Sequence, residues 1–181
     1  MSHTALIVRV PQAEARVGDL RARFDASAAL GVPAHVTVLF PFMAAERIDA
    51  EVLHGIRTAP DGALDGAPAF GFVLAGVARF AATAYLEPDP AEPFIDLTKR
   101  LVRRFPDFPP FSGEFETIVP HLTAAHGDAA QADLAHAELL RRVAAGGAVH
   151  SLCDAVVLLE NSSGRWREMQ VFTLAPASAR V

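Results

Sequence analysis

The two halves of the sequence follow the same order of predicted elements. Apolar periodicity and Pro or Gly boundaries predict strand, helix, strand, helix and strand, and the order then begins again. The first set covers residues 3–10, 12–30, 33–42, 46–59 and 68–78; the second covers 83–88, 93–105, 118–127, 131–147 and 148–160, with a last strand at 166–175. Two copies are too few for a solenoid, which needs three or more.

This order predicts an α+β fold with two pseudo-symmetric lobes. Antiparallel sheets would line a central cleft, and the helices would lie outside them. We expect residues 1–181 to form a single domain, with lobes of roughly 1–80 and 81–181. Whether strands are exchanged between the lobes stays open.

The third element of each half carries a His-x-Thr triplet. It occurs as PAHVTVLFPF in the first half and as IVPHLTAAHG in the second. Residues i and i+2 of a strand point to the same face, so His35 shares a face with Thr37, and His121 with Thr123. The residues between them are apolar and would anchor each strand in the core. Each half thus presents one imidazole beside one hydroxyl.

Two imidazoles across a cleft suit acid–base chemistry on a phosphodiester. One neutral imidazole can take a proton from the nucleophile while a protonated one donates to the leaving oxygen. Two hydroxyls can donate hydrogen bonds to the non-bridging oxygens of the anion between them. Unperturbed imidazoles predict a bell-shaped pH profile with both limbs near neutral. A metal ion is not required for this reaction.

The paired motifs HVTV (35–38) and HLTA (121–124) resemble those of the 2H phosphoesterase superfamily, which includes 2′-5′ RNA ligase-like proteins and cyclic nucleotide phosphodiesterases. The resemblance covers nearly the whole chain. It implies a bilobal α+β fold and metal-independent, cofactor-free hydrolysis of 2′,3′-cyclic or related phosphoesters of nucleotides or RNA ends. It also implies catalysis by His35 and His121, with phosphate bound by Thr37 and Thr123.

Two alternatives stay open. One is 2′-5′ RNA ligation, which should need a basic groove beyond the cleft. The bacterial RNA ligase-like branch typically ends its first motif with Phe-Leu-Gly, whereas this chain has LFPF, which favours hydrolysis. The other alternative is a non-catalytic module that binds a nucleotide or an RNA end, although such a module needs no paired proton-transfer groups.

Five further residues are candidates for substrate contact. Aromatic rings near the two motifs could stack on a base, and a guanidinium after the final turn could bind a second phosphate. These candidates are Phe40, Phe42, Tyr85, Phe111 and Arg165. We interpret the other histidines as solvated or structural. A metal site at His121 and His126 is disfavoured.

The composition of the chain limits the kinds of partner that it can bind. The net charge of −5 argues against sequence-independent binding of long duplex nucleic acid, but not against binding of a nucleotide or an RNA end.

The single cysteine, Cys153, excludes an intramolecular disulfide, and we expect its side chain to be buried. Residues 67–86 are long enough to span a membrane, but Arg79 and internal Pro and Gly favour two strands joined by a turn. With no signal peptide evident at the start, we expect a cytoplasmic monomer.

Overall fold

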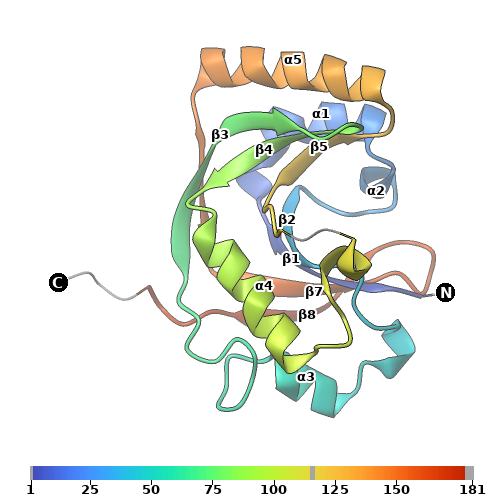
Figure 1. The fold of residues 1–181 in the computed structure, drawn as a ribbon, viewed down its shortest axis with the longest axis vertical. Coiled ribbons are helices and arrows are strands. Elements are labelled where there is room, and N and C mark those ends of the chain that lie inside the picture. Colours follow the sequence, from blue (N-terminus) through green and yellow to red (C-terminus); the bar gives the residue numbers. More distant parts are fainter. Residues whose placement is uncertain (1, 115–116, 178–181) are drawn as a thin grey trace.

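The computed structural model describes residues 2–114 and 117–177. Its strands are β1 (Thr4–Arg9), β2 (His35–Leu39), β3 (Phe70–Arg79), β4 (Thr83–Asp89), β5 (Leu122–His126), β6 (Val149–Cys153), β7 (Ala155–Glu160) and β8 (Arg167–Thr173). They form two four-stranded antiparallel sheets with the orders β2-β1-β7-β8 and β5-β4-β3-β6. The fold is therefore α+β, as the sequence predicted (Figure 1).

The helices lie outside the sheets. They are α1 (Glu14–Phe24), α2 (Ala26–Ala29), α3 (Ala50–Ile56), α4 (Glu92–Arg104) and α5 (Ala129–Gly146), with single 3₁₀ turns η1 (Pro11–Ala13), η2 (Ala45–Arg47) and η3 (Pro110–Gly113). Helices α1 and α5 contact each other and the β5 side of the second sheet, while α4 packs on β2 (Figure 1). The Thr98 hydroxyl of α4 donates to the Val38 carbonyl over 2.8 Å, which ties this helix to the first motif strand.

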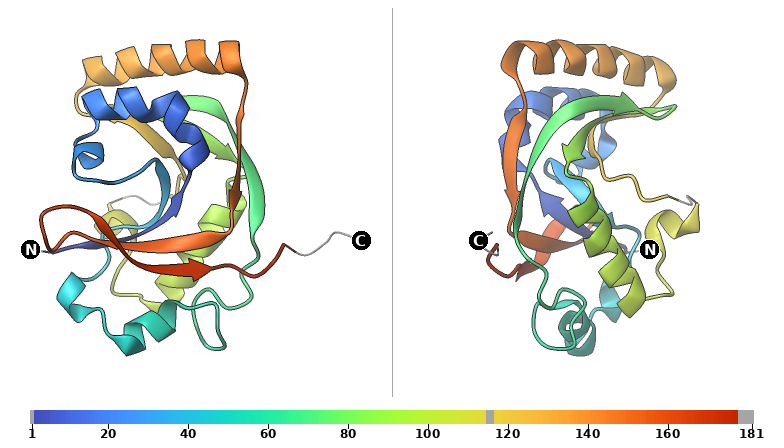
Figure 2. Two further views of the ribbon diagram at one scale, coloured as in Figure 1. Left: turned by 180° about the vertical axis from the view of Figure 1, so that it is seen from behind. Right: turned by 60° about the vertical axis from the view of Figure 1, so that its left-hand side comes forward.

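Each sheet combines strands from both halves of the chain, that is, from before and after residue 80. Strand β3 comes from the first half of the chain but pairs with β4 and β6. Strands β7 and β8 come from the second half but complete the sheet of β1 and β2. Figure 2 shows β6 running from the end of α5 toward β7, where the chain passes from one sheet to the other.

Three predicted elements are corrected by the structure. The strand predicted over 148–160 is two strands in different sheets, divided at Asp154. The helix predicted over 12–30 breaks at Asp25, whose extended backbone (φ −131°, ψ 101°) forms an isolated bridge with His126. The helix predicted over 46–59 is shorter, because Asp49 caps α3 by accepting from the Val52 amide over 2.9 Å.

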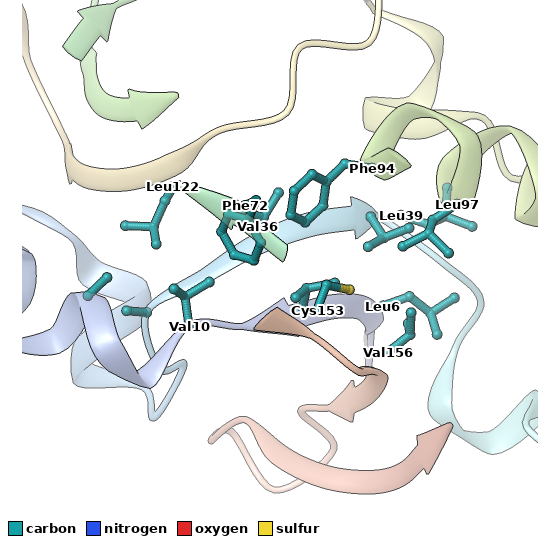
Figure 3. Packing of buried hydrophobic residues seen from close by; sticks show 14 of the residues in the cluster. Leu6, Val10, Val36, Leu39, Phe72, Phe94, Leu97, Leu122, Cys153 and Val156 are labelled. Atoms are coloured by element: carbon teal, nitrogen blue, oxygen red, sulfur yellow. The ribbon is translucent and has the colours of Figure 1, made fainter. Parts of the chain in front are cut away.

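The core lies between the sheets and explains the apolar residues of both motifs. Val36 and Leu122, each adjacent to a motif histidine, are fully buried and point into this core (Figure 3). Cys153 is also buried there, and burial raises the pKa of its thiol to about 12.

Residues 67–86 form mostly β3, a turn and β4, as predicted. Among the described residues, none of the helices has the length and apolar character needed to cross a membrane.

Candidate active site

The two His-x-Thr triplets lie on contacting strands. His35 begins β2, and His121 directly precedes β5. These strands contact each other in the middle of the molecule (Figure 1), and the charge of His121 is one of the smaller causes that lower the pKa of His35. In both triplets the His and Thr are half-buried while the intervening residue is buried, so each pair shares the face away from the core.

Each imidazole is held by the same local contact. Nδ1 of His35 lies 2.8 Å from the Pro33 carbonyl oxygen, and Nδ1 of His121 lies 2.7 Å from that of Val119. A carbonyl oxygen only accepts, so Nδ1 carries the proton in both rings. Nε2 is then the nitrogen of each ring that can accept a proton when the ring is neutral and donate one when the ring is protonated.

Burial favours the neutral form of both rings. It lowers the pKa of His35 to about 4, although the bond to Pro33 opposes this shift. Burial likewise lowers the pKa of His121, opposed by the bond to Val119. Both rings are therefore mainly neutral in the free protein at neutral pH. A bound anion would favour the return of a proton to this pair, because an opposite charge stabilises an imidazolium.

The two threonine hydroxyls are available for a ligand. Across the described ranges, neither the Thr37 nor the Thr123 hydroxyl makes a hydrogen bond to another protein group. Each shares the face of its neighbouring histidine. The two motifs thus offer two hydroxyl donors and two Nε2 atoms, which are groups that can bind a tetrahedral anion and exchange protons with it.

His35 opens into a small apolar pocket of about 130 Å³. Thr37 and Phe40 line it together with Trp166, whose ring centroid is 6.1 Å from that of Phe40. Ser27 also contributes to the wall. Sequence reasoning placed Phe40 near the motif but missed Ser27 and did not select Trp166. Two features of the sequence could have pointed to Trp166: it is the chain's only tryptophan, and it directly follows a predicted hairpin turn.

His121 sits among aromatic rings instead. Its ring centroid lies 5.1 Å from Tyr85, 5.4 Å from Phe80 in an edge contact, and 6.4 Å from Phe111 in a stacked one. Tyr85 and Phe111 were candidates from the sequence, whereas Phe80, which directly follows β3, was missed. The two imidazoles thus have different neighbours despite their matching backbone contacts.

Two other candidates lie elsewhere. Phe42 is buried in the core, in edge contacts with Phe105 and Phe108 at 5.2 Å each. Arg165 is exposed in the β7–β8 turn near Gly31 and joins no ion pair among the described residues. The structure therefore brings Phe40, Tyr85 and Phe111 to the two histidines and leaves Phe42 facing the core.

A buried ion pair supports the His35 side of the site. Arg21 Nε lies 3.0 Å from Asp25 Oδ2, and Arg21 also donates to the Val32 carbonyl over 2.9 Å. Asp25 accepts from both the amide and the hydroxyl of Ser27. These bonds fix the segment that supplies the pocket residues Ser27 and Val32 and ends at Pro33. Sequence reasoning missed the pair, because an Arg and an Asp four residues apart on a helix are usually solvated.

The remaining histidines lie outside this constellation. Nδ1 of His126 is 2.8 Å from the Thr83 hydroxyl. The His3 ring edge approaches Phe40 at 6.5 Å between centroids, and His54, His136 and His150 lie on α3, α5 and β6. Among the described residues, no three His, Cys, Asp or Glu side chains gather as metal ligands.

The family model described as the 2′-5′ RNA ligase superfamily matches residues 10–165, which include both motifs and most of the chain. The chain belongs to the 2′-5′ RNA ligase superfamily. No curated protein matches the sequence significantly.

Solved structures similar to this superfamily member share its fold at low sequence identity. Escherichia coli LigT complexed with 3′-AMP has a TM-score of 0.61 and 18% identity, and its complex with NADP+ has 0.60 and 17%. The protein TT0787 of Thermus thermophilus has a TM-score of 0.62 and 14% identity. Each similarity covers 96% of this chain and 98% of the other chain.

Proposed function

We propose that this protein is a metal-independent phosphoesterase that acts on 2′,3′-cyclic or related phosphodiesters of nucleotides or RNA ends. The observation that carries the proposal is the matched pair of imidazoles, each with Nδ1 bound to a carbonyl and a free threonine hydroxyl on the same face. Membership of the 2′-5′ RNA ligase superfamily supports it. So do the crystal structures of LigT with 3′-AMP and NADP+, which show nucleotide binding by a protein of the same fold.

The proposed reaction needs only the chain's own groups and water. The Thr37 and Thr123 hydroxyls donate to the non-bridging oxygens of the cyclic phosphodiester. Nε2 of one histidine takes a proton from water while the water oxygen bonds to phosphorus. The bond from phosphorus to one ribose oxygen breaks, and the other histidine gives its Nε2 proton to that oxygen. The product is a nucleoside monophosphate in which the cyclic phosphodiester ring has been opened.

Alanine replacement of either histidine tests this assignment. We expect His35→Ala and His121→Ala each to lower kcat for a 2′,3′-cyclic nucleotide by roughly 10²–10⁴-fold, since each removes one proton-transfer group. The assay contains EDTA, and His54→Ala serves as the control because His54 lies on α3, outside the site. Full activity in both alanine variants would refute the assignment, and loss of wild-type activity in EDTA would refute metal independence.

A ligation assay addresses the alternative that the family description favours. Here a 5′-hydroxyl would replace water as the nucleophile and a 2′-5′ bond would form. RNA ends bearing a 2′,3′-cyclic phosphate and a 5′-hydroxyl are the substrates for this assay. Binding without turnover of any substrate would instead indicate a non-catalytic module. We further propose that the protein acts in the cytoplasm as a monomer.

A further inference from the structure

A second hollow adjoins the His121 side of the site. It measures about 420 Å³ and lies between α4, η3 and the segment that precedes His121. Figure 1 shows α4 and η3 beside each other at this place. Phe111 forms part of its wall and also stacks on His121, so one ring separates the hollow from the imidazole. The Phe111 amide donates to the Phe40 carbonyl over 2.6 Å, which ties η3 to the end of the first motif strand.

Two cationic side chains face this hollow. Lys99 and Arg103 are four residues apart on α4, so they lie on one face of the helix, and both line the hollow together with Thr117. Within the described part of the chain, neither makes an ion pair or a hydrogen bond through its side chain. Among the described carboxylates, Asp96 and Glu114 do not line the hollow and form no ion pair with Lys99 or Arg103.

The neighbouring cations on the same helix are engaged differently. Arg100 donates to the Asp65 carbonyl over 2.9 Å, and the Arg104 guanidinium lies 5.4 Å from the Phe105 ring centre. Neither lines the hollow. The arrangement therefore leaves two cations in the wall of the hollow with no partner among the described residues. Such a pair suits a phosphate group, because lysine offers a point charge and arginine a fork of donors.

We propose that this hollow binds a phosphate of the substrate that lies at least one nucleotide away from the reacting phosphodiester. The end of a single-stranded RNA should then bind more tightly than a mononucleotide, which has no phosphate to place in this hollow. This inference rests on the proposed function, whose reacting phosphate lies between the two histidines. The net charge of −5 does not oppose it, because the cations act locally.

Equilibrium binding of two probes tests the inference. The probes are a labelled RNA tetranucleotide with a 3′-phosphate and, as a competitor, the corresponding nucleoside 3′-phosphate. The variant K99Q/R103Q removes both cations from the hollow. Its matched control, R100Q/R104Q, removes two charges from the same helix at the same spacing, one position along. A second variant, K99R/R103K, keeps both charges and shows whether the helix tolerates substitution.

We expect K99Q/R103Q to weaken tetranucleotide binding roughly tenfold relative to the control. The slope of log K against log salt concentration should fall by about 0.7 for each phosphate that the protein no longer neutralises. The variant K99R/R103K should bind as tightly as wild type. Equal weakening in K99Q/R103Q and the control, or no weakening in either, would overturn the inference. Failure of the proposed function would appear separately, as wild-type protein that binds the probes but hydrolyses no phosphodiester.

Discussion

At the scale of single residues, the pKa of His35 links catalysis to stability. Burial lowers it to about 4 from an ordinary value of 6.5. Between these values the unfolded chain binds a proton at this residue that the folded chain does not. The free energy of unfolding therefore falls as the pH is lowered through this window, and the full contribution of the neutral ring is present only above pH 6.5.

This linkage predicts a measurable loss of stability in acid. The shift of His35 corresponds to a decrease of about 3 kcal/mol in the free energy of unfolding between neutral pH and pH 4. The variant His35→Gln cannot take up the proton, so its stability should depend less on pH by about this amount. Urea denaturation at several pH values measures the difference. Parallel curves for the two proteins would show that His35 does not carry the effect.

At the scale of elements, the break between α1 and α2 positions the first motif. Asp25 interrupts the helix, and Arg21 bonds both to its carboxylate and to the Val32 carbonyl. The segment that follows supplies the Pro33 carbonyl that holds His35 Nδ1. Both members of the ion pair are almost fully buried. Removing one charge would therefore leave the other buried and unpaired.

The variant Arg21→Met tests this role. We expect it to lower the free energy of unfolding by about 3 kcal/mol or more, because it isolates the Asp25 carboxylate. Arg9→Met is the control, since Arg9 pairs only with Glu168 among the described residues, at 2.8 Å, and both side chains are nearly half exposed. It should cost about 1 kcal/mol or less. Equal costs in chemical denaturation would contradict the special importance of the buried pair.

At the scale of the whole molecule, strand exchange makes the two halves interdependent. Each sheet contains strands from both sides of residue 80, and the connection at Asp154 passes between the sheets. Residues 148–160 are apolar at most positions, so nothing in their hydrophobic pattern marks this crossing. We propose that residues 1–181 form one domain for this reason.

The site was predictable where it depends on local periodicity. The same-face placement of His35 and Thr37 follows from the alternation of a strand, and the burial of Val36 and Leu122 agrees with it. The pocket wall from Trp166 and the ring of Phe80 beside His121 depend on packing between distant segments, which periodicity does not encode. The carbonyl partners of the two Nδ1 atoms depend on backbone geometry just before each motif.

The depressed pKa values revise the expected pH profile. Unperturbed imidazoles predict two limbs near neutral, but burial in the folded protein lowers the pKa of both rings. The dependence of kcat/KM on pH reports groups of the free enzyme. Both limbs should therefore move to the acid side of neutral, with the apparent values belonging to the interacting pair.

The most direct test of the two-imidazole mechanism is kcat/KM for a 2′,3′-cyclic nucleotide, measured against pH in the presence of EDTA. The mechanism predicts a bell-shaped profile with both limbs on the acid side of neutral, because burial lowers the pKa of both rings. Replacing either histidine should remove the bell shape of the residual activity. A profile that is flat from pH 5 to pH 9 would contradict acid–base catalysis by His35 and His121.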